Sequence, residues 1–286
     1  MGLQIGDIVP RKSIELNELK GKTICIDAFN TLYQFISTIR QPDGTPLMDK
    51  NKRVTSHLSG LFYRNMSLIL DGIRLVYVFD GKRPDMKYKT SEIRRKIKDE
   101  AREKYEKAKS EGDIEGMGKY SRQLSVLNDN IIQESKELLE AMGIAVIQAP
   151  GEGEAQASYL AKTSAFAVGS QDYDSLLFGA PKLIQNLTLA RRRKTPSGFV
   201  FISPEVIELE KLLNNLQINM EQLISLGILA GTDYNPGGIK GIGQKRALQT
   251  VQQYKQPAVI FKHFEKQIGE QEKPFDWQEI FSLFKN

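Results

Sequence analysis

Short apolar runs that alternate with amphipathic segments constrain the fold of this chain more than any other feature. The runs are rich in β-branched residues and end in turn signals, so we predict strands over residues 22–27, 74–80, 145–148, 166–170 and 183–187. Apolar residues at helical spacing after Thr55 and Ser56 predict a helix between the first two strands. Strands separated by helices form parallel sheets with helices on both faces, so we expect an α/β fold around a mostly parallel sheet.

The composition is that of a globular protein of the cell interior. The 286 residues are 40% hydrophobic and 26% charged, enough for one substantial core and a smaller module. A single cysteine, Cys25, excludes an internal disulfide and a cysteine-rich zinc site. Neither a signal peptide nor a run of 18 apolar residues is visible, so we expect a soluble monomer of the cytoplasm or nucleoid, without membrane contact.

One segment breaks the apolar pattern. Residues 82–109 hold twelve Lys and Arg against six Asp and Glu, so this segment cannot be core. It is either a solvated helix with i,i+4 ion pairs or a mobile arm that meets an anion. It is an insertion between two sheet elements, and from residue 219 onward we expect short helices joined by glycine-rich turns.

Seven acidic residues lie at strand ends, helix starts or turns. Any one of them could simply cap a helix, and for a single residue that reading is as good as a functional one. Seven anions at one edge of a sheet would repel each other and need a counter-ion. The carboxyl ends of parallel strands form such an edge. The seven are Asp27, Asp80, Glu152, Glu154, Asp172, Asp174 and Asp233.

Oxygen ligands without His or Cys suit Mg²⁺ or Mn²⁺. Two such ions about 4 Å apart can clamp the attacking water and the leaving oxygen of a phosphodiester. Neither His57 nor His263 has a partnering motif, so we do not expect histidine chemistry. The acids therefore predict metal-dependent phosphoryl hydrolysis.

Other residues fit a nucleic-acid ligand. Gly241 and Gly243 form a tight turn before a helix that carries Lys245 and Arg246 in its first turn, a combination that suits a DNA backbone. Lys87 and Arg94 would share one helix face, and a solvated face is an equally good reading of them. Tyr33 could stack on an unpaired base or pack in the core. The basic run at 191–194 is a hairpin tip or an exposed turn, with no assigned role.

These residues lie in a series of motifs that resembles archaeal flap endonucleases from residue 1 to about residue 255. The motifs are IGDIVPRK, IDAFNTLYQF, STIRQPDGTPLMD, TSHLSGLFYR, VYVFDGKRP, APGEGEAQASY, SQDYDSLLFGAPKL and GTDYNPGGIKGIGQKRAL. The resemblance implies a 5′ flap endonuclease and 5′–3′ exonuclease of Okazaki fragment maturation and DNA repair. A bubble-cutting repair nuclease, an inactive DNA-binding scaffold and a small-molecule phosphatase are the alternatives.

The resemblance also implies roles for single residues and segments. The seven acids would bind two Mg²⁺ ions, Lys87 and Arg94 would be the catalytic basic pair, and Tyr33 would stack beside the scissile phosphate. Residues 84–125 would form a helical arch for the 5′ strand, and residues 35–47 a wedge between two duplex arms. The turn at Gly241 and Gly243 would belong to a helix-two-turn-helix element that grips duplex DNA around a K⁺ ion.

On this pattern we divide the chain into an N-terminal nuclease region at 1–98, the rest of the arch at 99–118, an internal nuclease region at 119–255 with the helix-two-turn-helix at 219–255, and shortened C-terminal helices at 256–286. Gly151 stands where a serine is common in the family, and Gly169 where an alanine is. The family's sliding clamp (PCNA) motif is missing, and its nearest match is Gln278, Phe281 and Phe284. The spacing of Trp277, Ile280, Phe281 and Phe284 instead predicts a helix packed on the domain.

Overall fold

The computed structural model describes residues 3–41, 43–81, 88–189, 192–195, 198–271 and 274–285. Its centre is a seven-stranded sheet in the order β1-β9-β6-β5-β2-β3-β4. The five strands from β4 to β6 run parallel, and β9 pairs antiparallel with both β6 and β1. The strands are β1 (Lys12–Ser13), β2 (Thr23–Asp27), β3 (Arg74–Phe79), β4 (Ala145–Gln148), β5 (Ala167–Gly169), β6 (Lys182–Gln185) and β9 (Glu205–Glu208).

The five predicted strands are confirmed, with ends within two residues of the observed ones. The sequence did not reveal β1 or β9. Lys12 and Ser13 carry no apolar alternation, and their pairing with Glu205 and Val206 is a contact between distant parts of the chain.

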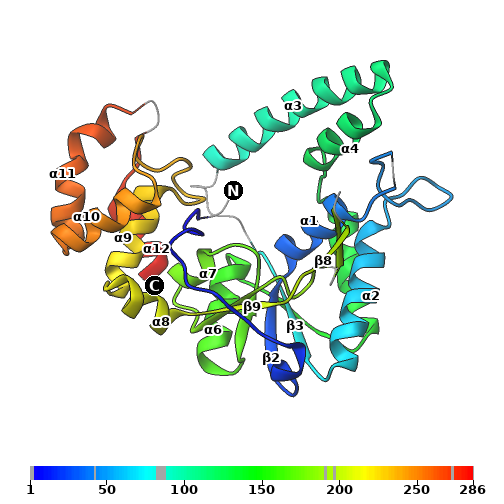
Figure 1. Ribbon diagram of the computed structural model, residues 1–286, viewed down its shortest axis with the longest axis horizontal. Coiled ribbons are helices and arrows are strands. Elements are labelled where there is room, and N and C mark those ends of the chain that lie inside the picture. The colour runs from blue at the N-terminus through cyan, green and yellow to red at the C-terminus, as the bar shows by residue number, and fades with distance from the viewer. Residues whose placement is uncertain are drawn as a thin grey trace.

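Helices cover both faces of the sheet, as expected. One face carries α1 (Ala28–Thr38), α2 (Ser56–Leu70) and α5 (Asp129–Ala141), while the other carries α6 (Gly153–Thr163), α7 (Asp174–Leu177), α8 (Leu209–Leu216) and α9 (Met220–Ala230). Figure 1 shows α1 and α2 on one side of β2 and β3, with α6 and α7 on the other. Alternation along β2 supplies both cores, because Ile24 and Ile26 enter one cluster and Cys25 the other. A single 3-10 turn, η1 (Leu16–Leu19), precedes β2.

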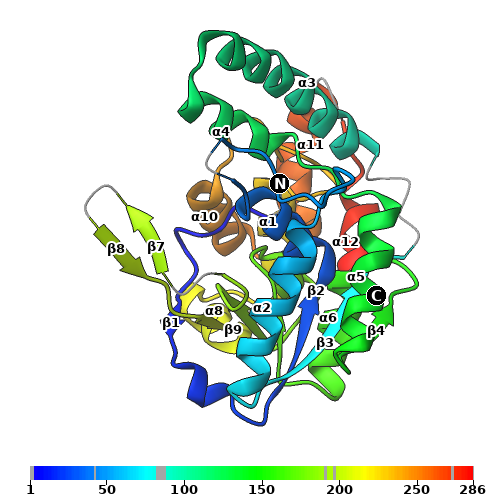
Figure 2. The ribbon, with the colours of Figure 1, turned by 90° about the vertical axis from the view of Figure 1, so that its right-hand side faces the viewer.

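From residue 88 onward the basic insertion is helical, in agreement with the helix alternative. It forms α3 (Tyr88–Glu111) and α4 (Ile114–Gln123), which pack on each other. Gly112 has a φ of 68° between them, and the Asp113 side chain caps α4 by accepting from the Gly116 backbone N–H at 2.9 Å. Figures 1 and 2 both show this helical hairpin above the carboxyl end of β2.

The chain after residue 219 is helical in its described parts, as predicted, and adds α10 (Gln244–Tyr254), α11 (Pro257–Gly269) and α12 (Trp277–Lys285) to α9. The α9–α10 connection turns sharply at Gly231 and Gly238, with φ of 107° and 57°. A Cβ at Gly238 would lie 2.3 Å from the Leu229 carbonyl oxygen, so only glycine fits there. None of the helices described is long and apolar enough to cross a membrane.

The packing prediction for α12 is confirmed. Ile280 and Phe284 are buried, and the Phe284 ring centre lies 4.8 Å from that of Phe178 and 5.5 Å from that of Tyr234. Trp277 stacks on Phe261 at 4.4 Å. The apolar side chains of α12 therefore belong to the domain core.

A second sheet has two strands, β7 (Arg192–Thr195) and β8 (Gly198–Phe201), which pair antiparallel. Most of the basic run at 191–194 thus lies in a strand, and the prediction of a tip or turn is wrong for residues 192–194. Without an apolar pattern in that run, only its pairing with β8 shows it to be extended. Figure 2 shows this hairpin projecting from the body of the molecule.

Candidate active site

The chain order of the strands defines a binding edge. From β2 the chain moves outward through β3 to β4, then returns to the other side of β2 to form β5 and β6. The direction of winding reverses between β2 and β5, and ligands of open α/β sheets bind at the carboxyl ends of the strands at such a point. Asp27 ends β2, and Asp172 follows β5 by three residues.

Asn30 joins these two acids. The Asp27 side chain caps α1 by accepting from the Asn30 backbone N–H at 3.1 Å. The Asn30 side chain donates to Asp172 Oδ2 at 2.8 Å and accepts from the Gln171 backbone N–H at 3.2 Å. Ser170 contacts both acids, since its hydroxyl lies 3.5 Å from Asp27 Oδ2 and accepts from the Asp172 backbone N–H at 3.2 Å. A neutral network therefore holds Asp27 and Asp172 side by side.

The acids of the next segment lie at the start of α6. Asp80 follows β3 and its Oδ1 accepts from the Gly153 backbone N–H at 2.7 Å. A Cβ on Gly153 would stand 2.8 Å from that same oxygen, so glycine allows the close approach. Glu152 is the residue before α6, and Glu154 lies in its first turn. The helix dipole favours carboxylates at this end.

Tyr234 brings a further group of acids together. Burial raises the pKa of Tyr234 well above its ordinary range, and the Glu152 carboxylate, which is hydrogen-bonded to the tyrosine, raises it further. Glu154 and Asp174 raise the pKa by their charge as well, so all three carboxylates lie near the Tyr234 hydroxyl. Both oxygens of Asp174 also accept from the Leu3 backbone N–H, at 3.3 and 3.4 Å. Asp233 directly precedes the tyrosine.

The donor chemistry of this edge fits a hard divalent cation. Every candidate ligand is a carboxylate, and one oxygen each of Glu152, Glu154 and Asp233 is buried from solvent. Burying several carboxylate oxygens is costly without a positive partner. Among the residues that the structure describes, no three acidic, His or Cys side chains stand close enough to hold a metal ion as they are.

The basic and aromatic candidates are placed only in part. Lys87 lies outside the described residues, and of Arg94 only the backbone, within α3, is described. Tyr33 lies on α1, six residues after Asp27, and its side chain is 42% exposed. The core alternative for Tyr33 is therefore wrong, because α1 buries the neighbouring Leu32 and leaves Tyr33 outside the core.

The glycine turn lies at the start of α10. Gly243 is the residue before the helix, and Gly241 has a φ of 81°. The side chains of Lys245 and Arg246 are exposed in the first helical turn, and Arg246 donates to the Gly241 carbonyl at 3.0 Å. The turn therefore presents helix N–H groups and two cations at the same place.

Residues 4–101 match the XPG N-terminal domain, and residues 143–233 match the XPG I-region. The protein called flap endonuclease 1 in Thermococcus onnurineus is 56% identical over 260 residues, which are 90% of this chain and 76% of that protein. The chain belongs to the flap endonuclease family. Its fold also resembles the solved flap endonuclease-1 from Methanococcus jannaschii, with a TM-score of 0.75, 40% identity, and coverage of 99% of this chain and 84% of that one. The catalytic core of Rad2 in complex with a DNA substrate is similar at a TM-score of 0.65 and 25% identity, over 100% of this chain and 79% of that one.

Sequence reasoning on this flap endonuclease family member missed three groups at the edge: Asn30, Tyr234 and the Leu3 backbone. Each acts through a contact across the fold rather than through a motif. The one available signal was position, because Asn30 stands three residues after Asp27 and Tyr234 directly follows Asp233.

Histidine plays no visible part at the edge. His57, at the start of α2, is fully buried, and its Nε2 lies 3.2 Å from Glu134 Oε2 on α5. His57 therefore has a partner that the sequence did not reveal, Glu134, and their contact joins α2 to α5 away from the acidic edge. His263 is exposed and lies beside Tyr254.

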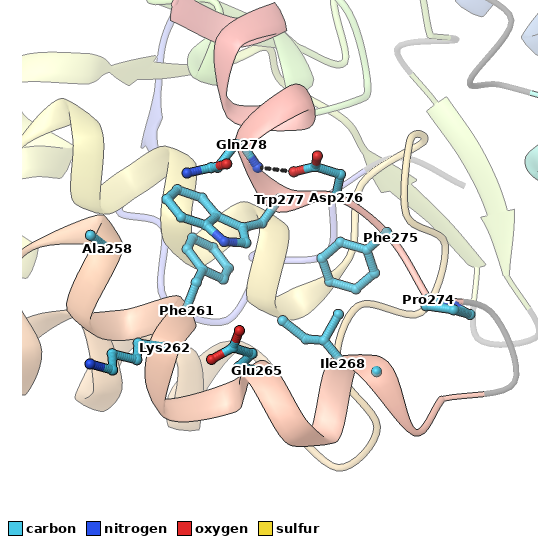
Figure 3. Close-up of a pocket in the computed structure, with 11 residues that line it drawn as sticks. Ala258, Phe261, Lys262, Glu265, Ile268, Pro274, Phe275, Asp276, Trp277 and Gln278 are labelled. Carbon is cyan, nitrogen blue, oxygen red and sulfur yellow. Dashed lines mark hydrogen bonds between the residues drawn. The ribbon is translucent and has the colours of Figure 1, made fainter.

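A separate pocket of about 710 Å³ opens between α11 and α12 (Figure 3). Trp277, Phe275 and Ile268 form its apolar wall, with Glu265 and Lys262 at the side. None of the predicted site residues lines it, so this pocket is not part of the candidate active site.

Proposed function

We propose that this chain is a structure-specific DNA nuclease that hydrolyses phosphodiesters at the base of 5′ flaps and also acts as a 5′–3′ exonuclease. The observation that carries the proposal is the edge between β2 and β5, where acids from separate segments of a flap endonuclease family member are fixed near each other. Asp27 and Asp172 share Asn30, and Glu152, Glu154 and Asp174 lie near Tyr234.

The proposed cofactor is a pair of Mg²⁺ ions, and Mn²⁺ fits the same oxygen donors. Bound ions would polarise the phosphodiester and stabilise the charge that develops on its oxygens. The residues that would hold them are Asp27, Asp80, Glu152, Glu154, Asp172, Asp174 and Asp233.

The protein's own groups would set the positions of these acids. Asn30 holds Asp172 through its side chain and Asp27 through its backbone. The Gly153 backbone N–H holds Asp80, and the Leu3 backbone N–H holds Asp174. Such fixed hydrogen bonds preorganise charge before substrate arrives.

Lys87 and Arg94 are proposed to stabilise the phosphate. Positive charges aimed at a developing oxyanion are a large source of catalysis. Tyr33 would stack on the nucleotide beside the scissile bond, consistent with its exposed ring. The α3–α4 hairpin would form the arch around the 5′ strand, and residues 35–47 the wedge between the duplex arms.

The proposed duplex anchor is the start of α10, with Gly241, Gly243, Lys245 and Arg246 on the phosphate backbone and a K⁺ ion at the turn. The division of the chain into regions that end at residues 98, 118 and 255 is also part of this proposal. A sliding clamp is not among the proposed partners of the segment around Gln278, because Phe284 is buried in the core and cannot fill a clamp pocket.

Cleavage of labelled DNA tests the proposal. Flap, nicked, bubble and single-stranded substrates would be incubated with Mg²⁺ or with EDTA. We expect metal-dependent cutting of the flap at the junction, and Asp80→Ala should lower the rate at least about 100-fold while leaving flap binding nearly intact.

Glu210→Gln removes an equal charge from the exposed first turn of α8 and serves as the matched control. Tight flap binding by the wild type without cutting in any divalent metal would favour the scaffold alternative. Preferential cutting of the bubble would favour a repair nuclease.

A further inference from the structure

The N-terminal segment, residues 3–11, contacts both the proposed duplex anchor at α10 and the acidic edge at Asp174. Leu3, Ile5 and Val9 are buried in the core cluster that also contains α9. Figure 1 shows the segment passing between α7 and the C-terminal helices. Its buried side chains fix its course, and its polar groups then reach residues on either side.

Asp7 contacts the start of α10 through two reciprocal hydrogen bonds. The Asp7 backbone N–H donates to Gln244 Oε1 at 3.1 Å, and Gln244 Nε2 donates to Asp7 Oδ2 at 2.6 Å. Gln244 is the first residue of α10, between Gly243 and Lys245. One side chain therefore fixes the orientation of the turn proposed to hold duplex DNA.

The other end of the segment contacts the acidic edge. The Leu3 backbone N–H donates to the Asp174 carboxylate. Arg11 joins the segment to Tyr173. Its guanidinium donates to the Gly6 carbonyl at 2.8 Å and lies 5.7 Å from the Tyr173 ring centre. Tyr173 is the residue before Asp174, so both contacts converge on the same loop.

The length of this connection sets a distance. Asp7 lies four residues after Leu3, and four extended residue steps span at most about 14 Å. Successive phosphates of one strand in B-DNA are about 3.4 Å apart along the helix axis. A shift of the α10 turn by that amount relative to Asp174 would bring the neighbouring phosphodiester to the acids.

We infer that the Asp7–Gln244 pair sets which phosphodiester is cut, by fixing the spacing between the duplex anchor at α10 and the acidic edge at Asp174. Gln244 and Asp7 are positioning residues that act through the backbone. The inference rests on the proposed function, since it needs both the anchor and the cleavage site. An ordinary surface contact between the same residues would contribute to stability and leave the cut position unchanged.

A charge-swap series on the full chain tests it. Gln244→Glu places two carboxylates against each other and removes the donor, whereas Gln244→Glu combined with Asp7→Asn restores a donor and an acceptor in reversed order. Gln244→Met removes both hydrogen bonds without adding charge. Gln253→Glu, on an exposed residue of α10, adds the same charge elsewhere on the helix and is the matched control.

The readout is the length of the product from an end-labelled flap, mapped at single-nucleotide resolution, with kcat and KM. Gln244→Glu should raise the fraction cut at the neighbouring phosphodiester about fivefold, with kcat lowered more than KM is changed. Gln244→Met should shift the cut in the same direction, and the double variant should recover the wild-type position. Gln253→Glu should match the wild type in position.

A wild-type product pattern from folded Gln244→Glu and Gln244→Met would overturn the inference, as would failure of the double variant to recover. Circular dichroism melting of each variant establishes that it is folded. Absence of cutting by the wild type would instead refute the proposed function, so the two failures are distinct.

Discussion

Gly169 offers a sharp test of how the sheet supports the acidic edge. It lies on β5 directly opposite Ile26 of β2, the residue before Asp27. A Cβ at position 169 would stand 2.6 Å from Ile26 Cδ1 and 3.3 Å from Ile24 Cγ2. Ile26 is fully buried, so its side chain has little room to move away. Alanine, the residue that the family resemblance led us to expect at this position, would be overpacked here.

Two effects of Gly169→Ala oppose each other. Forcing an extra methyl into a packed core costs about 1 to 3 kcal/mol. The loss of glycine's freedom in the unfolded chain stabilises by about 0.4 to 1 kcal/mol where the backbone suits alanine. The clash is the larger effect, so we expect Gly169→Ala to lower the free energy of unfolding by about 1 to 2 kcal/mol.

Two companion variants isolate the clash. Ile26→Val removes Cδ1 and by itself should cost about 0.5 to 1.5 kcal/mol. Combined with Gly169→Ala it should cost less than the sum of the single changes, because the added methyl takes the vacated space. Gly151→Ala is the matched control, since no heavy atom stands within 4 Å of its Cβ position, and it should be neutral or slightly stabilising.

Urea unfolding followed by circular dichroism measures the wild type and the four variants, and flap cleavage measures the effect on Asp27. Gly169→Ala should lower kcat as well as stability, and the double variant should lose less of both than the two single changes added together. A Gly169→Ala protein as stable as the wild type, or additive costs in the double variant, would refute the reasoning.

Three further predictions concern other parts of the molecule. Phe284→Ala removes a buried ring between Phe178 and Tyr234 and should lower the free energy of unfolding by about 3 to 5 kcal/mol in urea titrations, whereas Phe284→Leu should cost much less. Burial lowers the pKa of His57, against the opposing effect of Glu134, so the folded state binds its proton less tightly than the unfolded chain. The contribution of neutral His57 to the free energy of unfolding should therefore be fully present above about pH 6.5 and be lost as the pH falls below it. His57→Gln should flatten this pH dependence in urea midpoints measured across the range. Lys245→Ala with Arg246→Ala should weaken flap binding and reduce the slope of log K against log salt by about 1.8, and an unchanged slope would remove both residues from the phosphate contact.

The strand pattern could be predicted because its cause is local. Short β-branched runs such as the one at β3 are buried on both faces, so apolar content and turn signals mark them without knowledge of their partners. The hairpin β7–β8 was not predictable in the same way. Phe199 and Phe201 are 68% and 69% exposed, and the strand opposite them is basic, so no burial pattern marks either strand.

The same division applies to the candidate site. Asp27, Asp80 and Asp172 could be placed at one edge because parallel strands bring their carboxyl ends together. The residues that orient these acids could not be predicted, since Asn30 reaches Asp172 across 142 positions of sequence, and Leu3 reaches Asp174 across 171. Such hydrogen bonds depend on side-chain direction, which residue spacing alone does not give.

The sequence by itself determined the alternation of strands and helices, the acids at the strand ends, the glycine turn before a basic helix and the family resemblance, because each is carried by residues close together in the chain. The tertiary structure decided which acids share a partner, that Tyr33 is exposed, and that Asp7 meets Gln244. These are contacts between segments far apart in sequence, and packing of the whole chain is what brings them within hydrogen-bond distance.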